Sequence, residues 1–227
     1  DLDEYAVEEA LRIAEAHGGN EEGGANTVTV ISMGPERATE AARKALSMGA
    51  NDAILISDPV LAGADAVVTA EVLANVILKG EFDIVICGTE STDARMSVVP
   101  AMMSEKLGCA QLTFASKVSV DPAAKKVSIT RVTEAGVDEV HGEFPCVISV
   151  VEKINEPRYP SFKGIMAAKK KVIDVRDFAS TGAQFTKSWS AVVDSAPRPP
   201  RAGGVVVTDD GTAGQKLVDF LSEKKLI

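Results

Sequence analysis

The sequence predicts an α/β fold, in which helices cover both faces of a parallel β-sheet and an antiparallel meander extends one edge. Up to residue 107, short apolar strands alternate with segments of helical periodicity, a pattern typical of a buried parallel sheet. From residue 112 to 143, segments of alternating polarity follow one another with only turn signals between them. This second pattern favours an antiparallel meander.

The elements of the first part follow from periodicity. Apolar residues at helical spacing predict four helices, at residues 4–16, 34–48, 65–79 and 96–107. Short and almost entirely apolar strands lie between them, at residues 27–33, 53–57 and 83–87. We expect Asp1 or Asp3 to cap the first helix and Gly49 to end the second.

The second part changes in character along its length. Strands are predicted at residues 112–120, 125–133, 137–143 and 145–151, the last of them apolar throughout. Beyond Ile154 the chain is less regular, with a proline-rich stretch at 197–201 and an amphipathic helix at 210–226. We therefore expect an α/β domain over residues 1–176, and an extended arm ending in a helix over 177–227 that packs on another protein.

Composition excludes several classes of function. The chain of 227 residues has 24 Lys and Arg against 33 Asp and Glu, a net charge of −9, so binding to a nucleic-acid backbone is disfavoured. No apolar run reaches the roughly 18–20 residues of a membrane span, which predicts a soluble protein without membrane insertion. Three Cys without a Cys-x-x-Cys pair and only two His predict reduced thiols and no histidine-based zinc site.

A polar loop at residues 87–99, CGTESTDARMSVV, is the strongest candidate for ligand binding. It follows a parallel strand and leads into a helix, the place where open α/β sheets bind ligands. Its hydroxyls and the N–H groups of the helix N-terminus suit a phosphate. The alternative is that Ser, Thr and Asp here only cap the helix. The loop at 33–35 has the same position after its strand, where a plain tight turn is the alternative.

Catalytic groups are few. The sequence offers no Ser-His-Asp set, no evident Cys-His pair, no metal-spaced carboxylates and no phosphate-binding Gly-x-x-x-x-Gly-Lys motif. His141 falls on an edge-type strand, where a solvated side chain is expected. The chain is therefore predicted to hold a ligand rather than to transform one.

Residues 152–171 form a basic segment with two of the few aromatic side chains. Six basic and two acidic residues give it a charge of +4 within an acidic chain. Pro157 and Pro160 stiffen it, and Tyr159 and Phe162 precede a short helix. Aromatic side chains backed by positive charge favour a protein-docking surface. The alternative is that Phe162 and its apolar neighbours pack this helix on the core.

The most specific stretch of the chain, NEPRYPSFKGIMAAKKK, runs from Asn155 to Lys171. On this stretch, together with AVEEALRI at 6–13, MGP at 33–35, ALSMGA at 45–50 and, more loosely, CGTESTD at 87–93, the chain resembles the β subunit of electron-transfer flavoprotein. The likeness covers nearly the whole chain. The family's first strand and the loop after it have no counterpart, and we expect the natural N-terminus to lie upstream of Asp1.

The resemblance implies a flavodoxin-like core that binds structural AMP, in a heterodimer whose α subunit holds most of the redox FAD while β forms one side of its pocket. Such proteins are electron carriers rather than enzymes on their own. They take electrons from flavin dehydrogenases, typically the acyl-CoA dehydrogenases of fatty acid β-oxidation, and pass them to a membrane quinone oxidoreductase. We expect the bacterial cytoplasm, and the mitochondrial matrix is also compatible.

The resemblance also assigns site residues. AMP contacts fall on the two loops, at Met33, Gly88, Thr89, Thr92, Asp93, Met96, Ser97, Val98 and Val99. Many relatives have polar residues at positions 98 and 99, so the phosphate here would rely on backbone N–H groups and Ser97. Dehydrogenase docking falls on Tyr159, Pro160, Ser161, Phe162, Lys163, Gly164, Ile165 and Met166. Phe162 stands at the anchor position, which is usually Leu.

Other functions stay open at this point. A stand-alone adenine-nucleotide sensor or hydrolase would account for the two loops but not for the segment 155–171 or the arm, and a pure scaffold would hold no nucleotide. Some bacterial relatives bifurcate electrons with a second FAD in the AMP site. Their loop typically reads Gly-Arg-Gln-x-x-Asp-Gly-Asp, and GTESTDAR at 88–95 does not match it. The resemblance therefore favours AMP and simple electron carriage.

Overall fold

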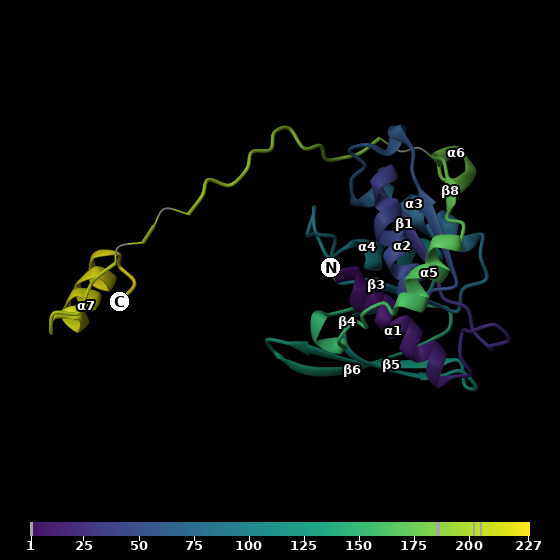
Figure 1. Ribbon diagram of the computed structural model, residues 1–227, viewed down its shortest axis with the longest axis horizontal. Coiled ribbons are helices and arrows are strands. Elements are labelled where there is room, and N and C mark those ends of the chain that lie inside the picture. The colour runs from purple at the N-terminus through teal and green to yellow at the C-terminus, as the bar shows by residue number, and fades with distance from the viewer. Residues whose placement is uncertain (1, 185–186, 202, 205) are drawn as a thin grey trace. The chain divides into compact units, whose positions relative to one another are not determined.

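Helices and strands alternate through the first 107 residues, as the sequence predicts. The computed structural model describes residues 2–184, 187–201, 203–204 and 206–227 (Figure 1). The order is α1 (Leu2–Ala16), β1 (Thr29–Met33), α2 (Thr39–Met48), β2 (Asp52–Ile56), α3 (Ala66–Leu78), β3 (Ile84–Gly88) and α4 (Val99–Leu107). Single 3-10 turns, η1 (Glu36–Ala38) and η2 (Pro59–Leu61), stand before α2 and α3.

The second part contains the predicted meander and one more buried strand. The strands are β4 (Ala110–Asp121), β5 (Lys126–Thr133), β6 (Gly136–Glu143) and β7 (Cys146–Val150). They are followed by η3 (Glu152–Ile154), α5 (Phe162–Lys170), β8 (Asp174–Arg176) and α6 (Phe178–Thr181). His141 lies on β6, the edge strand, where it is exposed as expected and contacts the Ser128 hydroxyl at 2.8 Å.

The strands form two sheets. One is parallel and three-stranded, in the order β1-β2-β8, and the other has five strands in the order β3-β7-β4-β5-β6. In the second sheet β3, β7 and β4 are parallel, whereas β4, β5 and β6 are antiparallel. The mixed α/β fold with an antiparallel edge is thus confirmed. Its strands are divided between two sheets because β1 pairs with β2 and β3 pairs with β7.

Helices pack on both faces of the parallel strands β2 and β7, whose successive residues point to opposite sides. In β2, Leu55 packs with Leu46 of α2 and Ala168 of α5, while Ile56 packs with Val72 of α3 on the other face. In the second sheet, Ile148 of β7 faces α1, whereas Val147 faces α3 and α4. Ala6 of α1 lies in the cluster of Ile148, and Met103 of α4 in that of Val147.

Three details differ from the prediction. Asp3 lies inside α1 and does not cap it, while Asp1 lies outside the described residues. The helix predicted from residue 96 begins at Val99, because Ser97 has a φ of 56°, which a right-handed helix does not allow, and Pro100 occupies the first turn. The short elements β8 and α6 are too brief to produce a periodic pattern.

The chain divides into two units, residues 1–191 and 192–227. The first contains both sheets and their helices. In the second, the described residues between 192 and 212 form neither helix nor strand, and α7 (Ala213–Glu223) confirms the predicted terminal helix with shorter ends.

Candidate functional site

The loop after β3 is closed on itself and tied to the neighbouring strand. Thr89 Oγ1 donates a hydrogen bond to the carbonyl oxygen of Val150, at the end of β7, over 2.7 Å. Across the loop, Ser97 Oγ donates to the Glu90 carboxylate over 3.0 Å. Asp93 accepts the N–H of Ala94, and the Ser91 hydroxyl, followed by this N–H, lowers the pKa of the Asp93 carboxyl. The polar side chains of the loop are therefore engaged largely with the loop itself.

The N-terminus of α4 carries no side-chain cap. Its N-cap residue is Val98, which has no hydroxyl or carboxylate to offer, and no side-chain cap bond is formed there. The loop reaches the helix through Arg95 and Ser97, whose φ values of 50° and 56° are left-handed and strained for non-glycine residues. The alternative that Ser, Thr or Asp caps this helix is therefore not seen at its N-cap position. The N-cap side chain therefore supplies no acceptor for the N–H groups of the first turn of α4.

Gly88 marks a close approach between β3 and the start of α1. A Cβ at this position would lie 3.2 Å from both Asp3 Oδ1 and the Leu2 carbonyl oxygen. Burial raises the pKa of the Asp3 carboxyl, and burial together with Asp3 raises the pKa of the Cys87 thiol to about 12. Asp3, which the sequence indicated only as a possible helix cap, therefore lies beside the end of β3 with its side chain exposed.

The remaining predicted AMP residues lie in two places. Met33, at the end of β1, packs against the cluster of Ile56 and α3. The loop residues Thr92, Asp93 and Met96 are exposed, whereas Val99 packs partly against Met103. The chain thus gathers residues 88–99 in one loop, while the side chain of Met33 contributes to the core beneath β1.

The predicted docking segment presents an apolar surface. Tyr159 is 92% exposed and Phe162 is 80% exposed, while Ile165 and Met166, one turn further along α5, are 40% and 42% exposed. Phe162 therefore does not pack α5 on the core, contrary to the alternative considered above. The basic residues Lys163, Lys169 and Lys170 are exposed on the same short helix.

Small residues and backbone contacts attach α5 to α2, which lies alongside it (Figure 1). Ala168 is buried, and a Cβ on Gly164 would lie 2.5 Å from the Ser47 carbonyl oxygen at the end of α2. Arg43 of α2 donates to the carbonyl oxygens of Ala168 and Lys171. Lys171 Nζ in turn donates to the carbonyl oxygens of Ala50 and Asn51 over 2.7 and 2.8 Å. The C-terminal end of α5 is therefore fixed to the sheet body.

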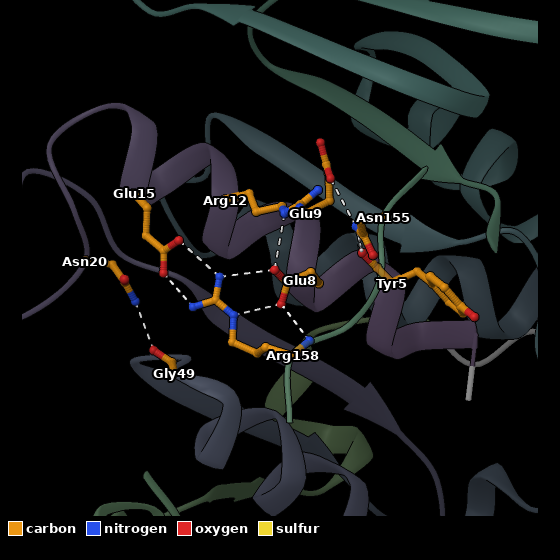
Figure 2. Close-up of polar contacts among 9 residues, drawn as sticks. All are labelled: Tyr5, Glu8, Glu9, Arg12, Glu15, Asn20, Gly49, Asn155 and Arg158. Carbon is orange, nitrogen blue, oxygen red and sulfur yellow. Dashed lines mark hydrogen bonds and ion pairs between the residues drawn. The ribbon is translucent and has the colours of Figure 1, made fainter. Parts of the chain in front are cut away.

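The N-terminal end of the segment is fixed to α1 by polar contacts (Figure 2). Arg158 contacts the carboxylates of Glu8 and Glu15, and Asn155 donates to Glu9 and to the Tyr5 carbonyl oxygen. Asn155 and Arg158 belong to the family-specific stretch, but the sequence did not predict a role for them. The available signal was the pair Glu8–Glu9 on the apolar side of a helix, where carboxylates need partners.

Two further classes of site are absent from the described part of the chain. No three His, Cys, Asp or Glu side chains come together as a metal site would require. No helix there has the length and apolar character needed to cross a membrane.

Comparison with known proteins identifies the family. The model of the electron transfer flavoprotein domain matches residues 1–181. The chain belongs to the electron transfer flavoprotein β-subunit family. It is 44% identical to electron transfer flavoprotein subunit beta of Mycobacterium tuberculosis, over 100% of this chain and 86% of the relative. The equivalent subunit of Thermoanaerobacterium thermosaccharolyticum is 36% identical over 99% of this chain and 86% of the relative. Protein FixA of Azotobacter vinelandii is 36% identical over 79% of this chain and 63% of the relative.

Membership of the electron transfer flavoprotein family establishes the general role. The chain is an electron-carrier subunit rather than a catalyst on its own, and it is associated with a flavin. A β subunit implies an α subunit as its partner.

Proposed function

We propose that this β subunit binds AMP at residues 88–99, forms one side of the FAD pocket of its α subunit, and docks flavin dehydrogenases through residues 159–166. Electrons from dehydrogenases of the acyl-CoA type then pass through the flavin to a quinone oxidoreductase. The flavin supplies the redox chemistry, and this chain supplies binding and docking. The observation that carries the proposal is the exposed apolar surface on the family-specific segment.

The docking surface has the composition of a binding hot spot. Tyr159 and Phe162 project large apolar side chains into solvent, and an anchor of this type gains most of its binding energy by filling a pocket on the partner. Pro160, Ser161 and Gly164 shape the segment, while Ile165 and Met166 broaden the apolar surface. Lys163 adds positive charge, which favours a dehydrogenase surface with an acidic rim and speeds encounter.

Replacing the anchor tests the docking proposal. In the purified αβ complex, Phe162→Ala removes the exposed ring, so electron transfer from an acyl-CoA dehydrogenase should need a higher concentration of complex, by about tenfold or more. FAD content and chemical reduction of the flavin should be unchanged. Leu78→Ala, which alters an exposed apolar residue at the end of α3, is the matched control. Unchanged dehydrogenase kinetics of the Phe162 variant would contradict the docking assignment.

The loop 88–99 fits the phosphate of AMP in two respects. The N-terminus of α4, which has no side-chain cap, supplies N–H donors, and the strained Arg95 and Ser97 are typical of ligand-binding turns. We assign the AMP contacts to the residues that the family resemblance indicates: Met33, Gly88, Thr89, Thr92, Asp93, Met96, Ser97, Val98 and Val99.

Mass spectrometry of the ligands released from the native αβ complex tests this site. We expect one AMP and one FAD per heterodimer, whereas two FAD or no AMP would contradict the proposal. Val99→Asp should release AMP while the FAD is retained, because a carboxylate at the start of α4 competes with phosphate for the same N–H groups. Val60→Asp, on the exposed turn η2, is a control with the same change of charge.

The C-terminal unit fits a role in assembly. Leu217, Val218 and Phe220 leave α7 with an exposed apolar face, and we assign this face to the α subunit. Deletion of residues 192–227 should then weaken co-purification of the α subunit, and unchanged co-purification would contradict the assignment. The relatives named above are bacterial, and we place the complex in the bacterial cytoplasm.

A further inference from the structure

Helix α1 carries two consecutive buried carboxylates. Glu8 is 4% exposed and Glu9 is 8% exposed, although both lie on a helix that packs against the five-stranded sheet. A carboxylate in such a place is unfavourable unless charged or hydrogen-bonding groups surround it. The partners of these two groups therefore show what α1 is built to hold.

The partners come from residues 155–158, about 150 positions further along the chain. Glu8 accepts hydrogen bonds from the Arg158 backbone N–H at 3.1 Å, from Nε at 2.7 Å and from a terminal guanidinium nitrogen at 3.2 Å. The same guanidinium group extends to Glu15, about two turns further along α1 (Figure 2). Arg12 also contacts Glu8, at 3.3 Å. Arg158 is therefore held at both its backbone and its side chain.

Asn155 makes a second attachment to the same helix. Its Nδ2 donates to the Tyr5 carbonyl oxygen over 2.9 Å and to Glu9 Oε2 over 3.0 Å. Within the described part of the chain, its Oδ1 is buried without a hydrogen-bond partner, so the amide is oriented by its NH2 group alone. Pro157 lies between the two attachments and restricts the backbone there.

These contacts lie directly beside the docking surface. Arg158 precedes Tyr159, and Ser161, three residues on, caps α5 by accepting the Gly164 N–H at 3.0 Å. At the far end, Arg43 and Lys171 hold the last turn of α5 to the sheet body. The exposed residues between these points project from a segment whose two ends are both fixed. A surface fixed in this way loses little conformational freedom on binding.

We propose that Arg158 is a positioning residue for dehydrogenase docking: through Glu8 and Glu15 it fixes the direction from which Tyr159 and Phe162 project, without itself touching the dehydrogenase. This inference rests on the docking function proposed above. If Arg158 has this role, helix α1 influences electron acceptance although none of the docking residues lies on it.

The test separates positioning from direct contact by changing the carboxylates and leaving Arg158 in place. In the αβ complex, Glu8→Gln combined with Glu15→Gln should raise the KM of an acyl-CoA dehydrogenase for the complex by about tenfold, with kcat little changed, because the surface must be ordered during binding. Hydrogen exchange of residues 156–166 should become faster. The flavin absorbance spectrum and its chemical reduction should stay as in the unchanged complex.

Glu15→Gln alone, at a more exposed position, should give a smaller rise in KM. This single variant replaces the double variant in the test if the double variant does not fold.

The matched control is Glu4→Gln, which removes an ion pair with Lys44 from the same helix. It should leave KM unchanged. Arg158→Lys retains the charge but not the planar fork, and should fall between the double variant and the unchanged complex.

The outcomes also distinguish this inference from the docking function itself. If Phe162→Ala raises KM and the carboxylate variants do not, docking stands and the positioning role is wrong. If Arg158→Leu raises KM while the carboxylate variants do not, Arg158 touches the dehydrogenase directly, which also overturns the inference. If none of the variants, Phe162→Ala included, alters KM, the docking function fails.

Discussion

The loop 89–98 and the segment 155–170 both follow the end of a parallel strand and both lead into a helix, yet they are held in opposite ways. Residues 89–98 are joined mainly to one another, pass through two left-handed residues and enter α4 without a side-chain cap. Residues 155–170 are joined to α1 and α2 by long-range contacts and enter α5 through the Ser161 cap.

This difference matches the ligands that we propose for the two regions. A loop with open N–H groups and local strain is completed by a small anion that supplies the missing acceptors. A surface for a protein partner gains from being rigid before the encounter, because association already costs translational and rotational freedom. Four substitutions test whether the rigid and strained regions differ as described.

The largest effect is expected for Arg158→Leu. Glu8 would lose the guanidinium group and keep Arg12, and an incompletely paired buried carboxylate is strongly destabilising. Because Arg158 is one-third exposed, we expect a loss of about 2–3 kcal/mol in the free energy of unfolding, below the full cost of a broken buried pair. Urea unfolding followed by circular dichroism measures it.

The control for that change is Lys44→Met, which breaks the exposed ion pair with Glu4 on the same helix and should cost about 0.5 kcal/mol or less. Equal losses for the two variants would mean that residues 155–158 are held to α1 no more firmly than by an ordinary surface contact.

Next in size is Gly164→Ala. The added Cβ would lie 2.5 Å from the Ser47 carbonyl oxygen, which is backbone and cannot rotate away, so α5 must move relative to α2. We expect a loss of about 1–2 kcal/mol, measured by thermal unfolding. Ala167→Ser, on the exposed side of α5, should change stability by less than about 0.5 kcal/mol. A stabilised Gly164 variant would show that α5 is not packed closely on α2.

The opposite sign is expected in the strained loop. Arg95 has a φ of 50° and an exposed side chain, so Arg95→Gly relieves a left-handed conformation at the cost of a more flexible unfolded chain. We expect a gain of up to about 1 kcal/mol in the free energy of unfolding, by urea titration. Glu156→Gly, at an exposed position within residues 155–158, should instead destabilise the chain. A loss in both variants would remove the contrast between the two regions.

Local patterns predicted the fold well where burial alone sets the structure. In β2, the alternation of Ile54, Leu55 and Ile56 between two helix-covered faces follows directly from an apolar strand in an α/β sheet. The same holds for α3, where Asp65 stands at the N-cap with its carboxylate accepting the Val67 and Val68 N–H groups. The sequence pattern also predicted the meander, since β5 and β6 pair through a short turn.

Long-range polar contacts could not be predicted from local sequence patterns. Nothing near Glu8 in the sequence indicates Arg158, because the two are brought together by the packing of α1 beside the chain that leaves β7. Ser97 gives no sign of its left-handed backbone, which moves the start of α4 to Val99. The three residues of β8 pair with β2 only through tertiary folding. The docking residues were predicted, therefore, but not what holds them.

The smallest effect concerns the outer half of the Arg158 contact and depends on pH. The hydrogen bond from Arg158 lowers the pKa of Glu15 from its ordinary value of 4.5. Since the folded state favours the ionised carboxylate, this contribution is complete above about pH 4.5 and is lost as the pH falls through the lower folded-state pKa. Because Glu15 is half-exposed, Glu15→Gln should cost only about 0.5 kcal/mol at pH 7. The difference between the two proteins in urea unfolding should shrink toward zero as the pH falls below 4.5. A difference in the free energy of unfolding that stayed constant at acid pH would show that the Glu15 charge does not act on Arg158. Glu8 would then be the carboxylate that holds Arg158.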